Sequence, residues 1–133
     1  MNCTSLTGLL DLSHTKVTYI GKSTLNGCTN LTGVIFQSSL KYIGDQDGGS
    51  VFKDCIDLQF VRITSKNNDA AFELPDTLES IGYQAFYNCK SLPADTVITI
   101  LSTVTFIGNE AFHKISGITM IHVLQEDEKS YDN

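Results

Sequence analysis

Apolar residues recur along this chain in blocks with a constant internal spacing. In each block an apolar or cysteine residue is followed three positions later by a leucine or isoleucine: Cys3 with Leu6, Cys28 with Leu31, Cys55 with Leu58, Cys89 with Leu92, and Ile115 with Ile118. Successive blocks lie 25, 27, 34 and 26 residues apart. A period of about 20–29 residues is typical of solenoids, in which each repeat forms one coil and stacks on its neighbours. The pattern predicts about five stacked coils, and the longest step indicates an insertion.

A short alternating run follows each block and predicts a strand with one buried face. The runs are Leu10-Asp11-Leu12, Val34-Ile35-Phe36, Val61-Arg62-Ile63, Ile98-Thr99-Ile100 and Ile121-His122-Val123. Stacked coils should pair these strands side by side in a parallel sheet. Four units also contain an isoleucine that precedes a glycine, as in Ile81-Gly82, and the glycine allows a turn that a side chain would hinder. Phe86 and Phe112 fall at one phase with Leu25 and Phe52, so we expect all four in the core.

The segment 74–92 (LPDTLESIGYQAFYNCKSL) closely resembles the BspA-like leucine-rich repeats, also called the Treponema pallidum type. The resemblance extends from Met1 to about Leu124. It implies a β-rich leucine-rich-repeat solenoid with short parallel strands and little regular helix over residues 1–124, followed by an acidic C-terminal tail at 125–133. It further implies a cell-surface or secreted protein that takes part in adhesion or binds host proteins. The resemblance provides no catalytic residues.

The chain departs from the repeat in four places. It starts inside a repeat, so a preceding cap is either missing or part of a longer protein. Residues 45–50 interrupt one unit and residues 64–73 the next, and Lys114-Ile115 replaces the Asn-Cys of other copies. The stretch that begins at Asp45 is similar to a calcium loop, but the twelfth position holds Ile56 instead of the closing glutamate. We therefore interpret it as a flexible inserted turn.

Charge and hydropathy exclude two classes of partner. The net charge of the 133 residues is −6, and no basic stripe of the kind that binds nucleic acid is present. No run of 18 apolar residues predicts membrane insertion. The beginning of this chain lacks the basic and apolar regions of a signal peptide. The acidic residues near the end, Glu126, Asp127, Glu128 and Asp132, predict a solvated tail.

The cysteines and histidines do not suggest an enzyme. Four cysteines recur once per coil at one phase, which favours buried, reduced packing residues. A disulfide remains an alternative, because stacked coils lie within bridging distance, and a metal site is disfavoured because no Cys-x₂₋₄-Cys pair exists. His14, His113 and His122 share no local motif with a nucleophile. We expect no catalytic, metal-binding or cofactor-binding residue, and no cofactor.

The alternating runs indicate which residues face outward. One row should contain Asp11, Ile35, Arg62, Thr99 and His122, and an adjacent apolar row Leu9, Gly33, Phe60, Val97 and Met120. An exposed apolar row marks an interaction site, unless a neighbouring segment such as 64–73 covers it. These rows, without Gly33, are the candidate partner-binding residues of a non-enzymatic protein-binding or adhesion module. The alternative is a structural spacer or repeat fragment of a larger cell-surface protein. An uncapped N-terminal coil also predicts a homodimer.

Overall fold

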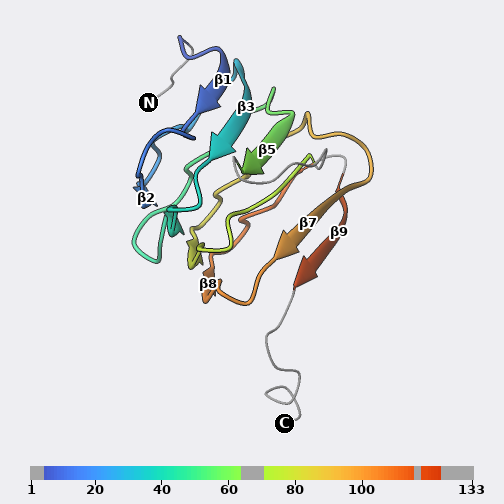
Figure 1. Ribbon diagram of the computed structural model, residues 1–133. Coiled ribbons are helices and arrows are strands. Elements are labelled where there is room, and N and C mark those ends of the chain that lie inside the picture. Colours follow the sequence, from blue (N-terminus) through green and yellow to red (C-terminus); the bar gives the residue numbers. More distant parts are fainter. Residues whose placement is uncertain (1–4, 64–70, 116–117, 124–133) are drawn as a thin grey trace.

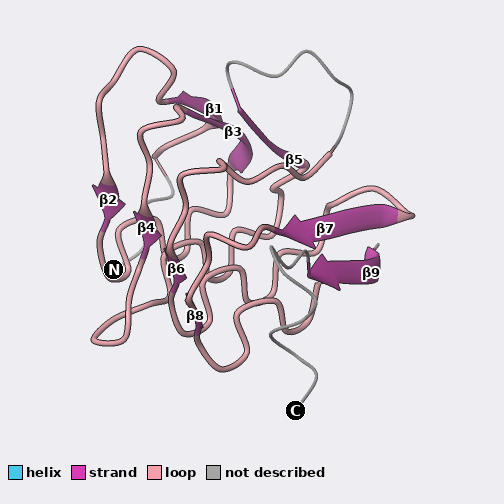
Figure 2. Cartoon of the chain, turned by 60° about the horizontal axis from the view of Figure 1, so that its bottom comes forward, coloured by secondary structure: helices cyan, strands magenta, loops and turns pink. Residues whose placement is uncertain are grey.

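The computed structural model describes residues 5–63, 71–115 and 118–123, with only the backbone described for 119–123. Its chain winds through four turns and ends on a further strand, without a helix in the described ranges (Figures 1 and 2). The strands are β1 (Gly8–Asp11), β2 (Tyr19–Ile20), β3 (Leu31–Phe36), β4 (Tyr42–Ile43), β5 (Phe60–Ile63), β6 (Ser80–Ile81), β7 (Thr96–Ile100), β8 (Phe106–Ile107) and β9 (Ile118–Val123). The predicted β-rich solenoid is confirmed.

The two-residue strands form one continuous parallel sheet in the order β2-β4-β6-β8. Ile20 pairs with Ile43, Ile43 with Ile81, and Ile81 with Ile107. The isoleucine of every Ile-Gly pair therefore stacks on its counterpart in the next coil, in the phase that the repeat predicts. The amide hydrogen bond of Gly44 to Ile20 O (2.9 Å) recurs one coil later from Gly82 to Ile43 O (2.7 Å).

The longer strands do not form the single sheet that we expected. They divide into a three-stranded sheet, β1-β3-β5, and a separate pair, β7-β9. The cause is the second insertion, because Val61 N–H donates to Ala71 O and Glu73 N–H donates to Val61 O, each at 2.8 Å. Residues 71–73 thus occupy the edge of β5 that β7 would otherwise take.

The core is built around a stack of phenylalanines. The rings of Phe52 and Phe86 are parallel at 5.1 Å between centroids, and those of Phe86 and Phe112 at 5.7 Å. Phe72, which belongs to the second insertion, packs edge-on against Phe86 at 5.1 Å. Phe52 and Phe86 are fully buried, Leu25 is buried and Phe112 is half-buried. The phase assigned from the sequence is therefore correct, although the last ring is only partly covered.

Two left-handed residues per coil shape the turns on the side opposite the long strands. The first set consists of Ser23, Ser50, Gln84 and Glu110, and the second of Gly27, Asp54, Asn88 and Lys114, with φ between 51° and 76°. Gly, Asn and Asp tolerate this conformation best, whereas other residues lose about 1–2 kcal/mol. The departure at Lys114 therefore places a long side chain at a position where the earlier coils use glycine, aspartate or asparagine.

The cysteines of successive coils stack in the core. Cys55 and Cys89 are free, buried thiols that donate to Leu25 O (3.2 Å) and Phe52 O (3.3 Å) of the preceding coil. Burial raises the pKa of Cys55 to about 12 and also raises that of Cys89. Cys28 is equally buried but is disulfide-bonded, so the prediction of four reduced cysteines is wrong. Stacking at one phase brings such residues within bridging distance.

Candidate protein-binding surface

The outward residues of the three-stranded sheet lie in two rows, in the register that alternation predicts. Leu9 pairs with Gly33 and Gly33 with Phe60, while Asp11 pairs with Ile35 and Ile35 with Arg62. Leu9 is 49% exposed, Asp11 is also exposed, and Ile35, Phe60 and Arg62 are half-buried. The structure brings all of these candidate residues onto one surface.

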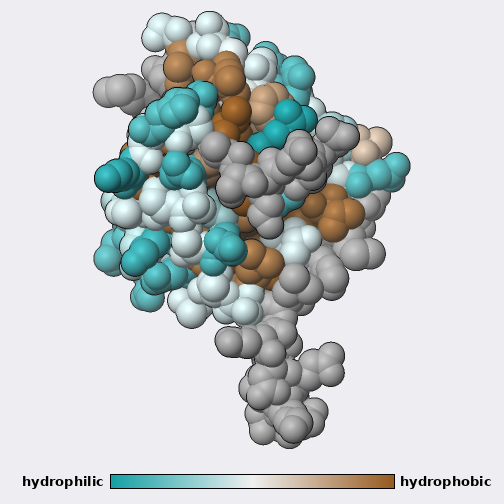
Figure 3. Space-filling model, viewed as in Figure 1, coloured by the Kyte–Doolittle hydropathy of each residue, from teal (hydrophilic) through white to brown (hydrophobic). Residues whose placement is uncertain are grey.

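The Phe60 ring organises this surface. The far end of the ring lies against Gly33, where a Cβ atom would clash with its carbons. The guanidinium carbon of Arg62 lies 4.2 Å from the centroid of the same ring, in the range of a cation–π contact. We call Leu9, Ile35, Phe60 and Arg62 the Phe60 patch. Figure 3 shows apolar surface over β1, β3 and β5 near the top of the view, with polar residues beside it.

The remaining candidate residues lie on the separate pair of strands. Val97 is 44% exposed and Thr99 half-buried on β7, and they pair with Met120 and His122 of β9. The side chains of Met120 and His122 lie outside the described residues. Because 71–73 intervenes at β5, the two predicted rows do not run unbroken across all the coils.

Asp11 has a local role beside the patch. Its carboxylate accepts a hydrogen bond from the Ser13 backbone amide at 2.9 Å. Hydrogen bonding from the Ser13 side chain and then from its amide lowers the pKa of Asp11. The carboxylate therefore closes the turn after β1 and stays ionised, which leaves one negative charge in the same row as Arg62, two strands away.

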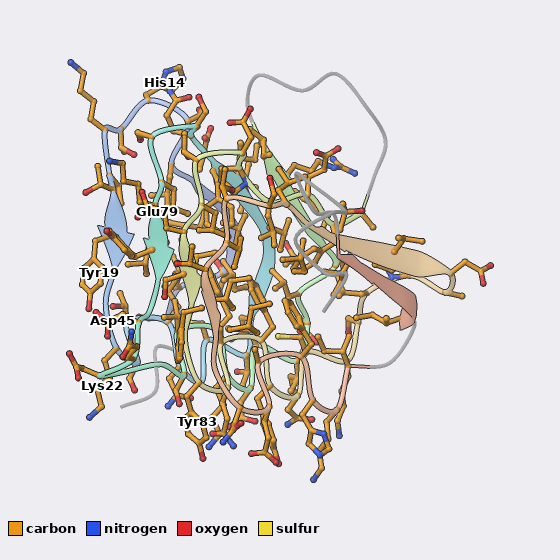
Figure 4. The ribbon with its side chains drawn as sticks, turned by 90° about the horizontal axis from the view of Figure 1, so that it is seen from below. His14, Tyr19, Lys22, Asp45, Glu79 and Tyr83 are labelled. Carbon is orange, nitrogen blue, oxygen red and sulfur yellow. The ribbon has the colours of Figure 1, made fainter. Side chains whose placement is uncertain are left out.

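A tyrosine pair on the four-stranded sheet was missed from the sequence. Tyr19 is 47% exposed and its ring meets that of Tyr42 edge-on at 5.9 Å. Their hydroxyls donate to Asp45 and Glu79, each at 3.3 Å (Figure 4). Burial and Asp45 raise the pKa of Tyr19, and the charge of Glu79 raises that of Tyr42. The sequence does contain a signal for this pair, because Tyr19 and Tyr42 each stand directly before the isoleucine of an Ile-Gly pair.

The first insertion folds as a closed turn. Asp45 N–H donates to Gly48 O at 2.8 Å, and the Asp45 carboxylate accepts from the amides of Asp47 (2.8 Å) and Gly48 (3.1 Å). The interpretation of a loosely held turn is replaced by a turn with its own hydrogen bonds. Through Tyr19, this insertion also connects the first coil to the second.

The two histidines whose side chains the structure describes lie in different turns of the solenoid. His14 is exposed in the turn after β1, and His113 packs against the Tyr87 ring at 5.6 Å. Within the described ranges no three His, Cys, Asp or Glu residues gather as a group that could hold a metal ion. A search of those same ranges for a helix long and apolar enough to cross a membrane finds none.

The coils and their ladders define a parallel β-solenoid of the leucine-rich-repeat class. The BspA type leucine rich repeat region matches residues 1–71 and 70–133 in six copies, so the chain belongs to this family. No curated protein matches the chain.

Three solved structures are similar in fold. The pneumococcal vaccine antigen PcpA is 22% identical with a TM-score of 0.59, over 81% of this chain and 22% of its own. The leucine-rich-repeat protein TpLRR of T. pallidum is 20% identical with a TM-score of 0.50, over 95% and 79%. A leucine-rich cell surface protein of Faecalibacterium prausnitzii A2-165 is 23% identical with a TM-score of 0.49, over 92% and 33%. The chain therefore spans about a fifth of PcpA.

Proposed function

We propose that this chain is a non-enzymatic protein-binding or adhesion module that docks a protein on the Phe60 patch. The observation that supports this proposal is the position of the Phe60 ring, which lies against Gly33 and is contacted by the guanidinium group of Arg62. Residues that dominate the binding energy of interfaces are enriched in aromatic side chains and arginine. Here an aromatic ring is already fixed in one orientation, which lowers the entropy lost when a partner binds.

The neighbours of the ring complete a surface suited to a partner with an apolar centre. Leu9 lies across Gly33 from Phe60 in the pairing register and exposes about half of its surface. Arg62 adds a positive charge and Asp11 a negative one in the adjacent row. A second contact region on β7 and β9 consists of Val97, Thr99, Met120 and His122. A large partner could contact both regions by extending over residues 71–73, which lie between them.

We assign the module to the cell surface or the secreted fraction. BspA-type leucine-rich-repeat proteins similar to this chain are cell-surface proteins. The disulfide at Cys28 also supports this assignment, because disulfides persist mainly in oxidising compartments. The acidic tail predicted at 125–133 lies outside the described residues and remains a prediction.

The test is a binding screen with matched variants. The chain would be immobilised and exposed to purified extracellular-matrix and plasma proteins, and the affinity of any ligand found would be measured for Phe60→Ala and Arg62→Ala. We expect each variant to lower the affinity at least tenfold, which corresponds to about 1.4 kcal/mol. Tyr19→Ala is the control, because it removes an exposed aromatic residue on β2, outside the patch.

Two results would reject the proposal. Unchanged affinity in both patch variants would place the binding site elsewhere. No ligand across the panel would favour the alternative of a structural spacer or repeat fragment within a larger surface protein.

Self-association through the first coil is a second candidate, and the burial of equivalent residues favours it. Leu10, Leu12 and Val17 are half-buried, whereas their counterparts one coil later, Val34, Phe36 and Leu40, are at most 2% exposed. The first coil also carries an apolar hollow of about 300 Å³. Its lining includes Leu10, Leu12, Val17, Ile20 and Leu25. Among the described strands, β1 and β2 are both sheet edges, which can pair with another chain.

A two-fold dimer would cover this hollow, because such an arrangement closes on itself. Light scattering of the 133-residue chain should show a dimer at micromolar concentration, and Leu10→Glu should yield a monomer. Val97→Glu, which charges an exposed apolar position on the separate sheet, should leave the dimer intact. A strictly monomeric chain over a wide concentration range would refute this candidate.

A further inference from the structure

A groove lined by both apolar and polar groups crosses the coils at the ends of the short strands, and we infer that it binds a neutral oligosaccharide. The groove has a volume of about 460 Å³ and is lined by Lys22, Asp47, Ser50, Tyr83, Phe106 and Asn109 above a floor that includes Gly48, Gly49 and Gly108. This volume lies within the range of small-ligand sites, about 300–1,000 Å³. We call it the Tyr83 groove.

The first insertion builds one wall of the groove. Coil three passes directly from Ile81-Gly82 through Tyr83 to the left-handed residue Gln84, whereas coil two has residues 45–49 between Gly44 and its left-handed Ser50. Every residue from Gln46 to Ser50 lines the groove. In solenoids, insertions between repeat positions often form the binding face. The closed turn of Asp45 holds this wall in place through its own hydrogen bonds.

Glycines open the floor. Lys22, Gly49, Tyr83 and Asn109 occupy one phase of successive coils, because Ser23 N–H donates to Gly49 O and Gln84 N–H donates to Asn109 O. A Cβ atom at Gly49 would clash with the Tyr83 backbone. The coil between Lys22 and Tyr83 therefore carries no side chain at this phase. The resulting trough runs across the coils and suits an extended ligand.

The polar side chains in the groove are available to a ligand. Among the described residues, Gln46, Ser50 and Asn109 make no side-chain hydrogen bond within the protein. Amide and hydroxyl groups can both donate and accept hydrogen bonds. These side chains can therefore bind neighbouring sugar hydroxyls either as donors or as acceptors. Two amides at left-handed turn positions are used differently: Gln84 donates to Glu110 at 2.7 Å and Asn88 to Asp54 at 2.8 Å.

An exposed aromatic ring accompanies these polar groups. Tyr83 is 48% exposed and points away from the core (Figure 4), and the half-buried Phe106 lies in the same groove. A pyranose ring has apolar C–H faces and a polar rim. It can thus stack on Tyr83 while its hydroxyls reach Asn109 or Asp47, in the way that tyrosine commonly combines an apolar face with polar contacts.

The lining disfavours other ligand classes. Lys22 is the single cation of the groove and Asp47 its single carboxylate, so their charges balance and neither an anion nor a cation is selected. The many polar groups disfavour an apolar ligand, which would leave them without hydrogen-bond partners. A neutral polyhydroxylated ligand satisfies both conditions.

The test follows backbone amides of the labelled full chain by NMR during titration with cellotriose, maltotriose and triacetylchitotriose. At least one trisaccharide should shift the amides of Gly48, Gly49, Tyr83 and Gly108, with saturation at millimolar concentration. Tyr83→Ala should weaken this binding at least about tenfold. Leu9→Ala is the control, because Leu9 is equally exposed (49%) but lies on β1 and does not line the groove, and it should leave the affinity unchanged.

A deletion of residues 46–49 provides a second measurement. It joins Asp45 to Ser50 and restores the spacing of Ile81-Gly82-Tyr83-Gln84, so the variant should keep the urea midpoint close to that of the parent while losing sugar binding. Absence of shifts with all three sugars would overturn the inference. Binding that survives Tyr83→Ala and the deletion, or that falls equally in Leu9→Ala, would also overturn it.

Discussion

Truncation of Phe86 tests the coil register at its centre. The side chain is fully buried, with parallel rings on both sides at 5.1 and 5.7 Å and the edge of Phe72 at 5.1 Å. Burial and cavity effects of a Phe→Ala change cost about 3–5 kcal/mol. Each aromatic pair contributes about 0.5–1.5 kcal/mol beyond its area, although neighbouring contributions do not add fully. We therefore expect Phe86→Ala to lower the free energy of unfolding by about 4–5 kcal/mol.

Urea unfolding followed by circular dichroism measures this loss. Phe86→Leu should cost about 1–2 kcal/mol and remains measurable if the alanine variant does not fold. Tyr83→Ala, an exposed aromatic control, should change stability by less than about 0.5 kcal/mol. A loss below about 1 kcal/mol for Phe86→Ala would refute the stacked register.

Three further predictions concern the turns and the thiols. Lys114→Gly relieves a left-handed lysine (φ 57°) and should stabilise the chain by about 0.5–1 kcal/mol in urea unfolding; a loss of stability would contradict this explanation. Thiol titration of the denatured chain without reductant should detect two of the four cysteines, and detection of four would exclude the disulfide. Burial raises the pKa of Cys55 from 9.0 to about 12, so above pH 9 the unfolded chain loses a proton that the folded chain keeps. Stability should then fall between pH 9 and 11 by about 2–3 kcal/mol from this group, and Cys55→Ala should reduce the slope; an unchanged slope would contradict the shift.

Much of the coil could be predicted because the repeat presents the same apolar positions several times. The ladder from Ile20 to Ile107, the phase of Phe86, and the outward rows through Phe60 and Arg62 all follow from spacing and alternation. A single coil gives only a few apolar positions, but agreement between coils fixes their common register.

Other features depend on contacts that no repeat encodes. The pairing of residues 71–73 with Val61 requires a backbone path through an insertion that has no counterpart in other coils. The sequence could not show that Cys28 forms a disulfide, because Cys55 and Cys89 occupy the same repeat position and are free thiols. The left-handed position of Gln84 is likewise invisible in the apolar pattern, because glutamine has no preference for that conformation.

The two insertions act on different faces, and together they locate the surfaces that distinguish this chain from a uniform solenoid. Residues 71–73 end the three-stranded sheet at β5, so Phe60 and Arg62 lie on its last strand instead of in the middle of an unbroken row. Residues 46–50 raise a wall above the glycine floor beside Tyr83. Because repeat positions are occupied by the stacking of coils, new binding chemistry in such a fold is most easily added where the repeat is interrupted. The Phe60 patch and the Tyr83 groove each lie at one of these interruptions.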